Sequence, residues 1–239
     1  MKAWKDADAY KVNFYGRVRR YYKYDTSNPS YHIIPNGNLT NTDGVLSGFT
    51  SSIYAKIEPP FMVSTNTWEI VFKFTTGTNI SSEQYVFASQ RGSSGAYHGI
   101  FFEIKSSKIF MQGSTNGSSW NINTGSTTTL TASTTYWAKG VFDGSTYKFY
   151  LSTDGTSFTQ EGSTVTNSNP IYQTTVVSRI GVYGNAAGYP FNGTVDLKES
   201  YINIGGGKWW EGVTYPILPA TSSDYDFYKD ERVYQAFNI

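Results

Sequence analysis

The clearest pattern in the chain is an alternation of apolar and polar residues over Trp68–Phe74, which has the sequence Trp-Glu-Ile-Val-Phe-Lys-Phe. Large apolar side chains occupy every second position, and Glu69 and Lys73 fall between them. Successive side chains of a strand point to opposite faces of a sheet, so this pattern predicts a strand with one face in a hydrophobic core.

Comparable apolar runs occur along most of the chain, at 32–34, 49–57, 85–88, 99–104, 108–111, 136–142, 147–151, 179–183 and 194–204. Turn-forming residues separate them, among them Pro35-Asn36-Gly37, Asn41-Thr42-Asp43-Gly44 and Asp143-Gly144. An Asp-Gly pair between two alternating runs predicts a hairpin whose two turn residues have positive φ. Short strands at this spacing predict an all-β sandwich.

An internal similarity supports this prediction. Ser114–Trp120 resembles Ser152–Phe158, and each segment predicts a turn that ends in an aromatic residue. Two copies indicate a recurring hairpin rather than a solenoid, which needs at least three.

The two ends of the chain differ from the part between them. The sequence predicts three parts: an N-terminal arm over residues 1–29, the sandwich over residues 30–212 and a C-terminal extension over residues 213–239. The arm has room for a short helix over Ala3–Tyr15. Residues 1–24 carry seven Lys or Arg and two Asp, whereas residues 211–239 carry five acidic and two basic side chains. Both ends are rich in aromatics, which disordered segments usually lack. The candidates for docking to partner proteins are Arg17, Arg19, Arg20, Tyr21, Tyr22, Tyr225, Phe227 and Tyr228.

Several segments resemble laminin-G-like modules, whose fold is the concanavalin A-like jelly roll. They are Phe49-Thr50-Ser51-Ser52, Trp68–Phe74, Tyr136-Trp137-Ala138-Lys139, Phe142-Asp143-Gly144, and Asp196-Leu197-Lys198 through Trp209-Trp210. This version of the module is similar to those of phage virion proteins, and it also occurs in bacterial surface proteins. The resemblance covers residues 30–212 and implies a jelly-roll β-sandwich.

The same resemblance implies a function. We expect a virion surface protein, as a fibre, decoration or receptor-binding component, with a lectin-like module that binds host-surface glycan. One alternative is a purely structural virion protein that binds only protein neighbours. Another is a bacterial surface adhesin module. The N- and C-terminal segments would contact other virion proteins. Whether the chain forms a homo-oligomer is left open.

Composition limits the other function classes. The net charge is +1, so no global field favours nucleic acid, and the absence of Cys excludes disulfides and thiolate sites. No secretory signal peptide or membrane-spanning run is expected, so the virion surface would be reached through particle assembly and cell lysis.

Catalysis is not expected, and neither is a cofactor. Glucanases of this fold carry two paired carboxylates on one strand, whereas Glu69 and Glu103 are single acids on predicted strands, where we expect exposed charges paired with Lys73 and Lys105. The chain is therefore predicted not to be an enzyme.

Metal binding stays open. Laminin-G-like relatives often bind calcium through Asp, Asn and backbone carbonyls, and the residues to consider are Asp43, Asp143, Asp154 and Asp196. Each lies in or beside a turn, where Asp more often stabilises the turn itself.

Two glycine-rich loops are the candidates for sugar binding, because they combine aromatic rings with amide and basic groups. Their candidate residues are Arg91, Tyr97, His98, Asn185 and Tyr189. The alternative is that Tyr97 and Tyr189 close the ends of the core. Core or rim packing, rather than sugar stacking, is expected for Trp120, Trp137, Trp209 and Trp210.

Overall fold

The computed structural model describes residues 4–6, 9–14, 17–22, 32–58, 67–89, 97–173, 178–184, 188–204 and 207–211. Every regular element in these ranges is a β-strand. No helix in them could cross a membrane.

Two large sheets contain fifteen of the strands, and all neighbouring strands within them are antiparallel. The seven-stranded sheet has the order β12 (Ile122–Gly125), β11 (Lys108–Gly113), β10 (Ile100–Lys105), β9 (Gln84–Ala88), β16 (Ser178–Ile180), β7 (Tyr54–Glu58) and β4 (His32–Asn36). β4 is an edge strand, which accommodates Pro35 within it.

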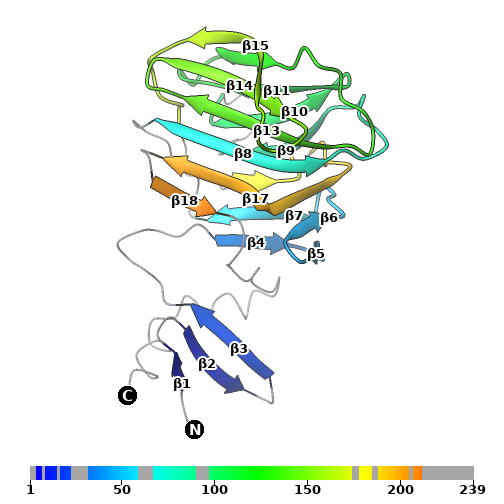
Figure 1. Cartoon of the computed structure of the whole chain (residues 1–239), viewed down its shortest axis with the longest axis vertical. Helices are drawn as coiled ribbons and strands as arrows, with labels where there is room; N and C mark the ends of the chain where they lie inside the picture. Colours follow the sequence, from blue (N-terminus) through cyan, green and yellow to red (C-terminus); the bar gives the residue numbers. More distant parts are fainter. Residues whose placement is uncertain are drawn as a thin grey trace.

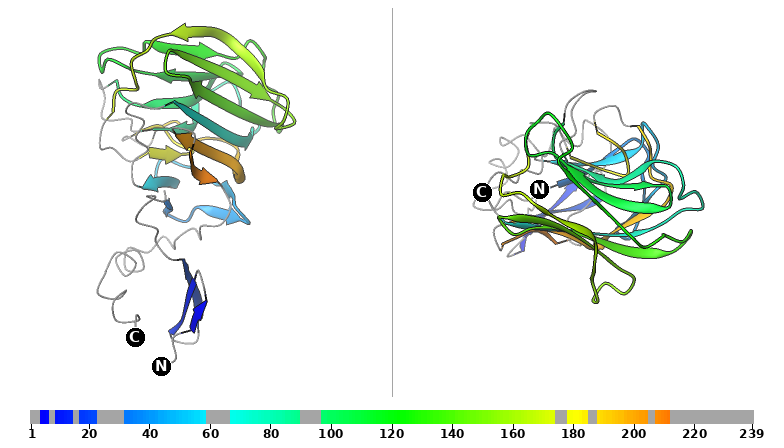
Figure 2. Two further views of the ribbon diagram at one scale, coloured as in Figure 1. Left: turned by 60° about the vertical axis from the view of Figure 1, so that its left-hand side comes forward. Right: turned by 90° about the horizontal axis from the view of Figure 1, so that it is seen from above.

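The eight-stranded sheet has the order β15 (Thr159–Thr166), β14 (Thr146–Ser152), β13 (Thr135–Phe142), β8 (Trp68–Thr75), β17 (Thr194–Ile204), β6 (Val45–Ser47) and β5 (Thr40–Thr42). β18 (Gly207–Glu211) pairs with the second half of β17. Figures 1 and 2 show the two sheets face to face, so the expected β-sandwich is confirmed.

The core lies between the sheets and follows the alternation in β8. Trp68, Ile70, Phe72 and Phe74 are all buried in it. The Phe72 ring stacks on Phe87 of the opposite sheet, with ring centroids 4.7 Å apart, and meets the edge of Phe102 at 6.3 Å. Removing one such ring typically costs about 3–5 kcal/mol, so these contacts hold the two sheets together.

The two Asp-Gly turns differ. Asp43 and Gly44 both have positive φ and join β5 to β6, with Thr42 paired to Val45, as expected of a two-residue hairpin. At the β13–β14 hairpin only Gly144 has positive φ, and Asp143 N donates to Thr146 O. The hairpin there is confirmed, and four residues separate the paired Phe142 and Tyr147. Asp143 stabilises this turn through its side chain, with Oδ1 accepting from Ser145 N and Thr146 N.

The N-terminal residues form strands where a helix over 3–15 was expected, so that prediction was wrong. β1 (Trp4–Asp6), β2 (Ala9–Phe14) and β3 (Arg17–Tyr22) make a three-stranded antiparallel sheet of their own. The β-branched and aromatic residues of β2 and β3 favour strands. The side chains of the β3 docking candidates, and the whole of 213–239, lie outside the described structure.

Other strands also differ from the pattern, and the short strands β5, β6 and β18 were not predicted. The run 49–57 begins as a tight turn, because Thr50 and Ile53 exchange backbone hydrogen bonds, and only Tyr54–Glu58 is strand. β12 and β15 were missed because they are short or polar; β15 has mostly exposed side chains at the edge of its sheet.

Candidate glycan-binding face

The outer face of the seven-stranded sheet carries a continuous group of aromatic rings. In β10, Phe102 and Ile104 face the core, so Phe101 and Glu103 face outward. Around Phe101 lies what we call the aromatic band: Tyr97, Trp120, Phe101, Tyr85, Tyr183 and Tyr189.

The band connects the two loops that the sequence analysis singled out. Tyr97 lies 4.9 Å from Trp120, and Trp120 lies 4.9 Å from Phe101, between ring centroids. Phe101 lies 5.4 Å from Tyr85, which is 6.1 Å from Tyr189. Aromatic pairs at these separations stabilise one another beyond their buried area.

Exposure changes along the band. Phe101 is 1% exposed, whereas Tyr189 is 51% exposed and has a positive φ of 50°. The rings of Tyr97 and Tyr189 pack on the outer face of the sheet, so the alternative that they close the ends of the core is wrong. Trp120 is half-buried in the band, which agrees with the packing role expected for it.

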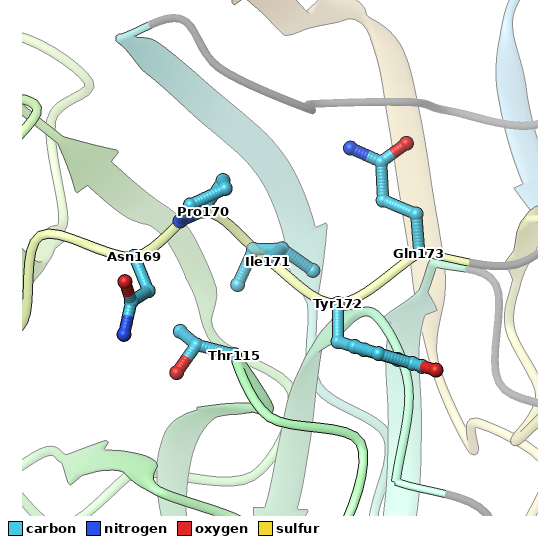
Figure 3. Close-up of a pocket in the computed structure, with 6 residues that line it drawn as sticks. All are labelled: Thr115, Asn169, Pro170, Ile171, Tyr172 and Gln173. Carbon is cyan, nitrogen blue, oxygen red and sulfur yellow. The ribbon is translucent and has the colours of Figure 1, made fainter.

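An open hollow of about 550 Å³ lies near the band, since Tyr172 in its lining stacks on His98, the residue after Tyr97. Thr115, Asn169, Pro170, Ile171, Tyr172 and Gln173 line it (Figure 3). Tyr172 is 45% exposed, and its ring stacks on His98 with centroids 5.3 Å apart and planes 17° from parallel. The structure thus brings His98 to a second exposed ring that sequence reasoning missed.

The backbone of Tyr172 is fixed from both sides. Its N–H donates to Ser114 O at 2.7 Å, and its carbonyl accepts from Gly99 N at 2.9 Å. Below the ring lies Gly117, which has a φ of 72°. Tyr172 is therefore held in place although its ring is exposed.

Gly117 belongs to a turn whose hydrogen bonds are repeated in the second copy found in the sequence. Asn116 Oδ1 accepts from Ser118 N and Ser119 N, and Gly117 N donates to Ser114 Oγ. The Ser152–Phe158 turn has the same three bonds, with Asp154 in place of the Asn. In the second copy Gly155 lies against the ring of Trp137, so each turn supports one ring.

Polar side chains line the hollow together with Tyr172. Thr115 Oγ1 accepts from Asn121 Nδ2 at 2.6 Å and from Asn167 Nδ2 at 3.1 Å. The Gln173 side chain leaves the segment on the side opposite Tyr172 (Figure 3), and neither of its buried amide atoms has a hydrogen-bond partner in the part of the chain that the structure describes.

The other end of the band carries a group of charges around Glu103. Tyr85 Oη donates to Glu83 Oε1 at 2.8 Å, and Lys105 Nζ lies 3.1 Å from Glu83 Oε2 and 3.8 Å from Glu103 Oε1. Glu103 is 3% exposed, so the prediction of an exposed strand charge was wrong. Burial, with the nearby Glu83 carboxylate, raises the pKa of Glu103 to about 7, although Lys105 opposes the shift.

The outer face of the eight-stranded sheet pairs its acids with lysines. Glu69 accepts from Tyr201 Oη and lies 3.9 Å from Lys139 Nζ. Lys73 Nζ lies 3.0 Å from Asp196 Oδ2 and 2.5 Å from Glu199 Oε1. The charges of these carboxylates are balanced by lysines, and the carboxylates accept hydrogen bonds. This arrangement suits side chains that pack on the sheet and orient one another.

Lys73 Nζ also lies 5.0 Å from the centre of the Trp137 ring, on the same face. Trp137 is half-buried there under the Ser152–Phe158 turn, in agreement with the rim packing expected for it.

The four aspartates considered for calcium have other partners. Asp143 and Asp154 accept hydrogen bonds within their own turns, as favoured from the sequence. Asp43 pairs with Lys198, and Asp196 with Lys73. In the described ranges no three His, Asp or Glu side chains gather as a metal would require. Arg91, Asn185 and the side chains of Trp209 and Trp210 lie outside the described structure.

Comparison with models of known protein families finds no match, and neither does comparison with curated protein sequences. Solved structures do match. Domain 4 of AbnA, a GH43 extracellular arabinanase from Geobacillus stearothermophilus solved with arabinotriose, superposes with a TM-score of 0.50 at 13% identity, covering 77% of this chain and 85% of that one.

The receptor-binding domain of botulinum neurotoxin D superposes with a TM-score of 0.52 at 9% identity. The match takes in 84% of this chain but 49% of the toxin chain, so the present chain spans about half of that structure. At these identities the likeness shows the fold, and the chain is a concanavalin A-like jelly-roll sandwich, as the sequence predicted.

Proposed function

We propose that this chain is a glycan-binding module that acts outside the cell, with Tyr172 as its sugar-stacking residue. The observation that carries the proposal is the exposed Tyr172 ring, stacked on His98 and bordered by the hollow of Thr115 and Asn169. The part of the ring that His98 and Gly117 leave exposed can contact the apolar face of a pyranose, while hydroxyl and amide groups beside it hydrogen-bond the sugar hydroxyls.

The rigidity of Tyr172 supports this role. A side chain that is already held in place loses little conformational entropy when a ligand binds. The two backbone hydrogen bonds of Tyr172 and the close packing on Gly117 provide that preorganisation. The half-exposed Tyr189, at the far end of the aromatic band, would contact a longer glycan that follows the face of the sheet.

The two structural neighbours are consistent with the proposal. One is a domain solved with an arabinose trisaccharide, and the other is the receptor-binding domain of a toxin. The resemblance to phage virion modules supports a place on a virus particle, where the chain would serve in host attachment. Many copies on one particle would turn weak single-site binding into firm attachment.

A second candidate function is docking to protein neighbours in the same particle. The separate β1–β3 sheet favours it, because β3 carries three arginines and two tyrosines outside the sandwich. Aromatic residues and arginine are enriched at protein interfaces. This function and glycan binding would use different parts of the chain.

A glycan array tests the proposal. The biotinylated full-length protein, presented as a streptavidin tetramer, is applied beside the variant Tyr172→Ala. We expect a defined set of glycans to bind the wild type, and the signal to be lost in the variant. An array without binding, or binding that the variant retains in full, would contradict the glycan-binding role.

A further inference from the structure

Arg179 is a buried cation on the same outer face as the aromatic band. It lies in the middle of β16, between Ser178 and Ile180, and it is 8% exposed. Ile180 points into the core, so Arg179 points outward.

The guanidinium of Arg179 is only partly satisfied. Nη1 donates to the Gly184 carbonyl, and the group lies 4.8 Å from the centre of the Tyr54 ring. Nε is buried and has no hydrogen-bond partner among the described residues. The ion pairs between described residues do not include Arg179. Arginines this deeply buried are normally paired with an anion, because a lone buried charge is costly.

Arg179 lies close to the proposed sugar site. It is directly opposite Ala88, which is in turn opposite Phe101 of the aromatic band. Adjacent strands are about 4.8 Å apart, so the backbones of Arg179 and Phe101 are separated by roughly 10 Å. Ser89, next to Ala88, packs against Gly99, whose N–H donates to the Tyr172 carbonyl.

We propose that Arg179 binds the carboxylate of an acidic sugar, so that the ligands of this site are glycans containing a uronic or sialic acid. The inference rests on the proposed glycan-binding function and specifies its ligand class. A guanidinium presents its N–H groups as a planar fork that matches the two oxygens of a carboxylate. The acid would satisfy Nε and neutralise the charge, while the sugar ring lies toward the aromatic band.

The test compares two carboxylate sugars, 3′-sialyllactose and a trigalacturonate, with their methyl esters, which keep each sugar and remove its charge. Binding to the full-length protein is measured by isothermal titration calorimetry. We expect at least one acid to bind about tenfold or more tightly than its ester, as for a charge-assisted hydrogen bond. Arg179→Gln should abolish that preference, and Arg179→Lys should restore it only in part.

A matched control variant and thermal unfolding of each variant distinguish a loss of glycan recognition from a loss of folding. Lys56→Gln removes a neighbouring charge, since Lys56 is the cross-strand partner of Arg179 on β7. It should change the preference for acid by less than about threefold, because a rim charge has little effect on affinity. Arg179→Lys also keeps the inference testable if Arg179→Gln fails to fold.

Four results would overturn the inference. If the esters bind as well as the acids, or Arg179→Gln keeps the preference, Arg179 has a structural role and neutral-glycan binding can still stand. If no glycan binds at all, the proposed function fails together with the inference. If a peptide of residues 222–232 binds the wild type but not Arg179→Gln, and the acidic sugars do not bind, the partner is a protein carboxylate.

Discussion

Tyr172 rests on Gly117, with no space between the ring and the glycine backbone for even one additional carbon. A Cβ at position 117 would lie 2.9 Å from two ring carbons of Tyr172, and the glycine φ of 72° disfavours any side chain. Gly117→Ala should therefore displace the ring and reduce glycan affinity severalfold. The backbone strain should also lower the free energy of unfolding by about 1–2 kcal/mol. Calorimetric titration with an array-identified glycan, together with urea unfolding, measures both effects.

Gly155→Ala is the control for that experiment. Gly155 has a φ of 74°, and a Cβ there would lie 2.8 Å from the Trp137 ring, on the eight-stranded sheet. We expect a similar loss of stability with unchanged glycan affinity. Equal affinity losses in the two variants would mean that Gly117→Ala acts through general destabilisation.

Glu103 should make the protein less stable as pH rises from about 4.5 to 7. Its pKa is raised from 4.5 to about 7 in the folded state, so the folded protein holds this proton more tightly than the unfolded chain. The resulting contribution to the free energy of unfolding is complete below pH 4.5 and is lost as pH rises through 7. It amounts to at most ~3 kcal/mol. Glu103→Gln should remove this loss and be at least as stable as the wild type at pH 8.

Urea unfolding of both proteins at pH 5, 6, 7 and 8 gives the difference between them, which cancels the titration of the other acids. A difference that does not change with pH would show that Glu103 ionises normally in the fold.

The contribution of Glu161 to stability should depend on pH in the opposite direction to that of Glu103. Burial alone raises its pKa, but hydrogen bonds from Thr128 and Thr127 outweigh burial and lower it. Its carboxylate accepts four hydrogen bonds from these two residues, at 2.6–3.2 Å. Its contribution to stability is therefore present above pH 4.5 and lost as pH falls through the lowered pKa.

Glu161→Gln should lower the free energy of unfolding at pH 7 by about 2–3 kcal/mol, because an amide cannot accept all four bonds. The gap to the wild type should narrow below pH 4, as urea unfolding at pH 3 and 7 would show. A gap of equal size at both pH values would refute the charge-assisted account.

The sequence predicted the sandwich because its strands alternate strongly. The spacing of Trp68, Ile70 and Phe72 is sufficient to place one face of β8 in the core. The repeated turns were recognisable too, because Asn116-Gly117 and Asp154-Gly155 form local hydrogen bonds that depend on few other residues. The alternation of apolar residues and the hydrogen bonds of a turn both depend on residues close together in the sequence, so both can be predicted without knowing the fold.

The site was only partly predictable, since it depends on contacts between distant segments. Tyr172 lies in no alternating run, and it stacks on His98, which lies 74 residues earlier in the chain. Glu103 and Arg179 have the residue types of exposed strand positions, yet both are buried on the outer face of their sheet. Glu103 lies beside Lys105, and Arg179 lies beside Tyr54 and Gly184. A one-dimensional pattern shows which face of a strand a residue lies on, but not whether that face is covered.

The most direct test of the central claim is the affinity of Tyr172→Ala for the best glycan of the array. Calorimetric titration compares it with the wild type and with Tyr150→Ala, which removes a half-buried ring from the outer face of the opposite sheet, beside Lys139. Loss of a stacking ring should weaken binding about tenfold or more, while Tyr150→Ala should bind like the wild type. If Tyr172→Ala binds the glycan as tightly as the wild type, Tyr172 is not the sugar-stacking residue and the proposed site is wrong.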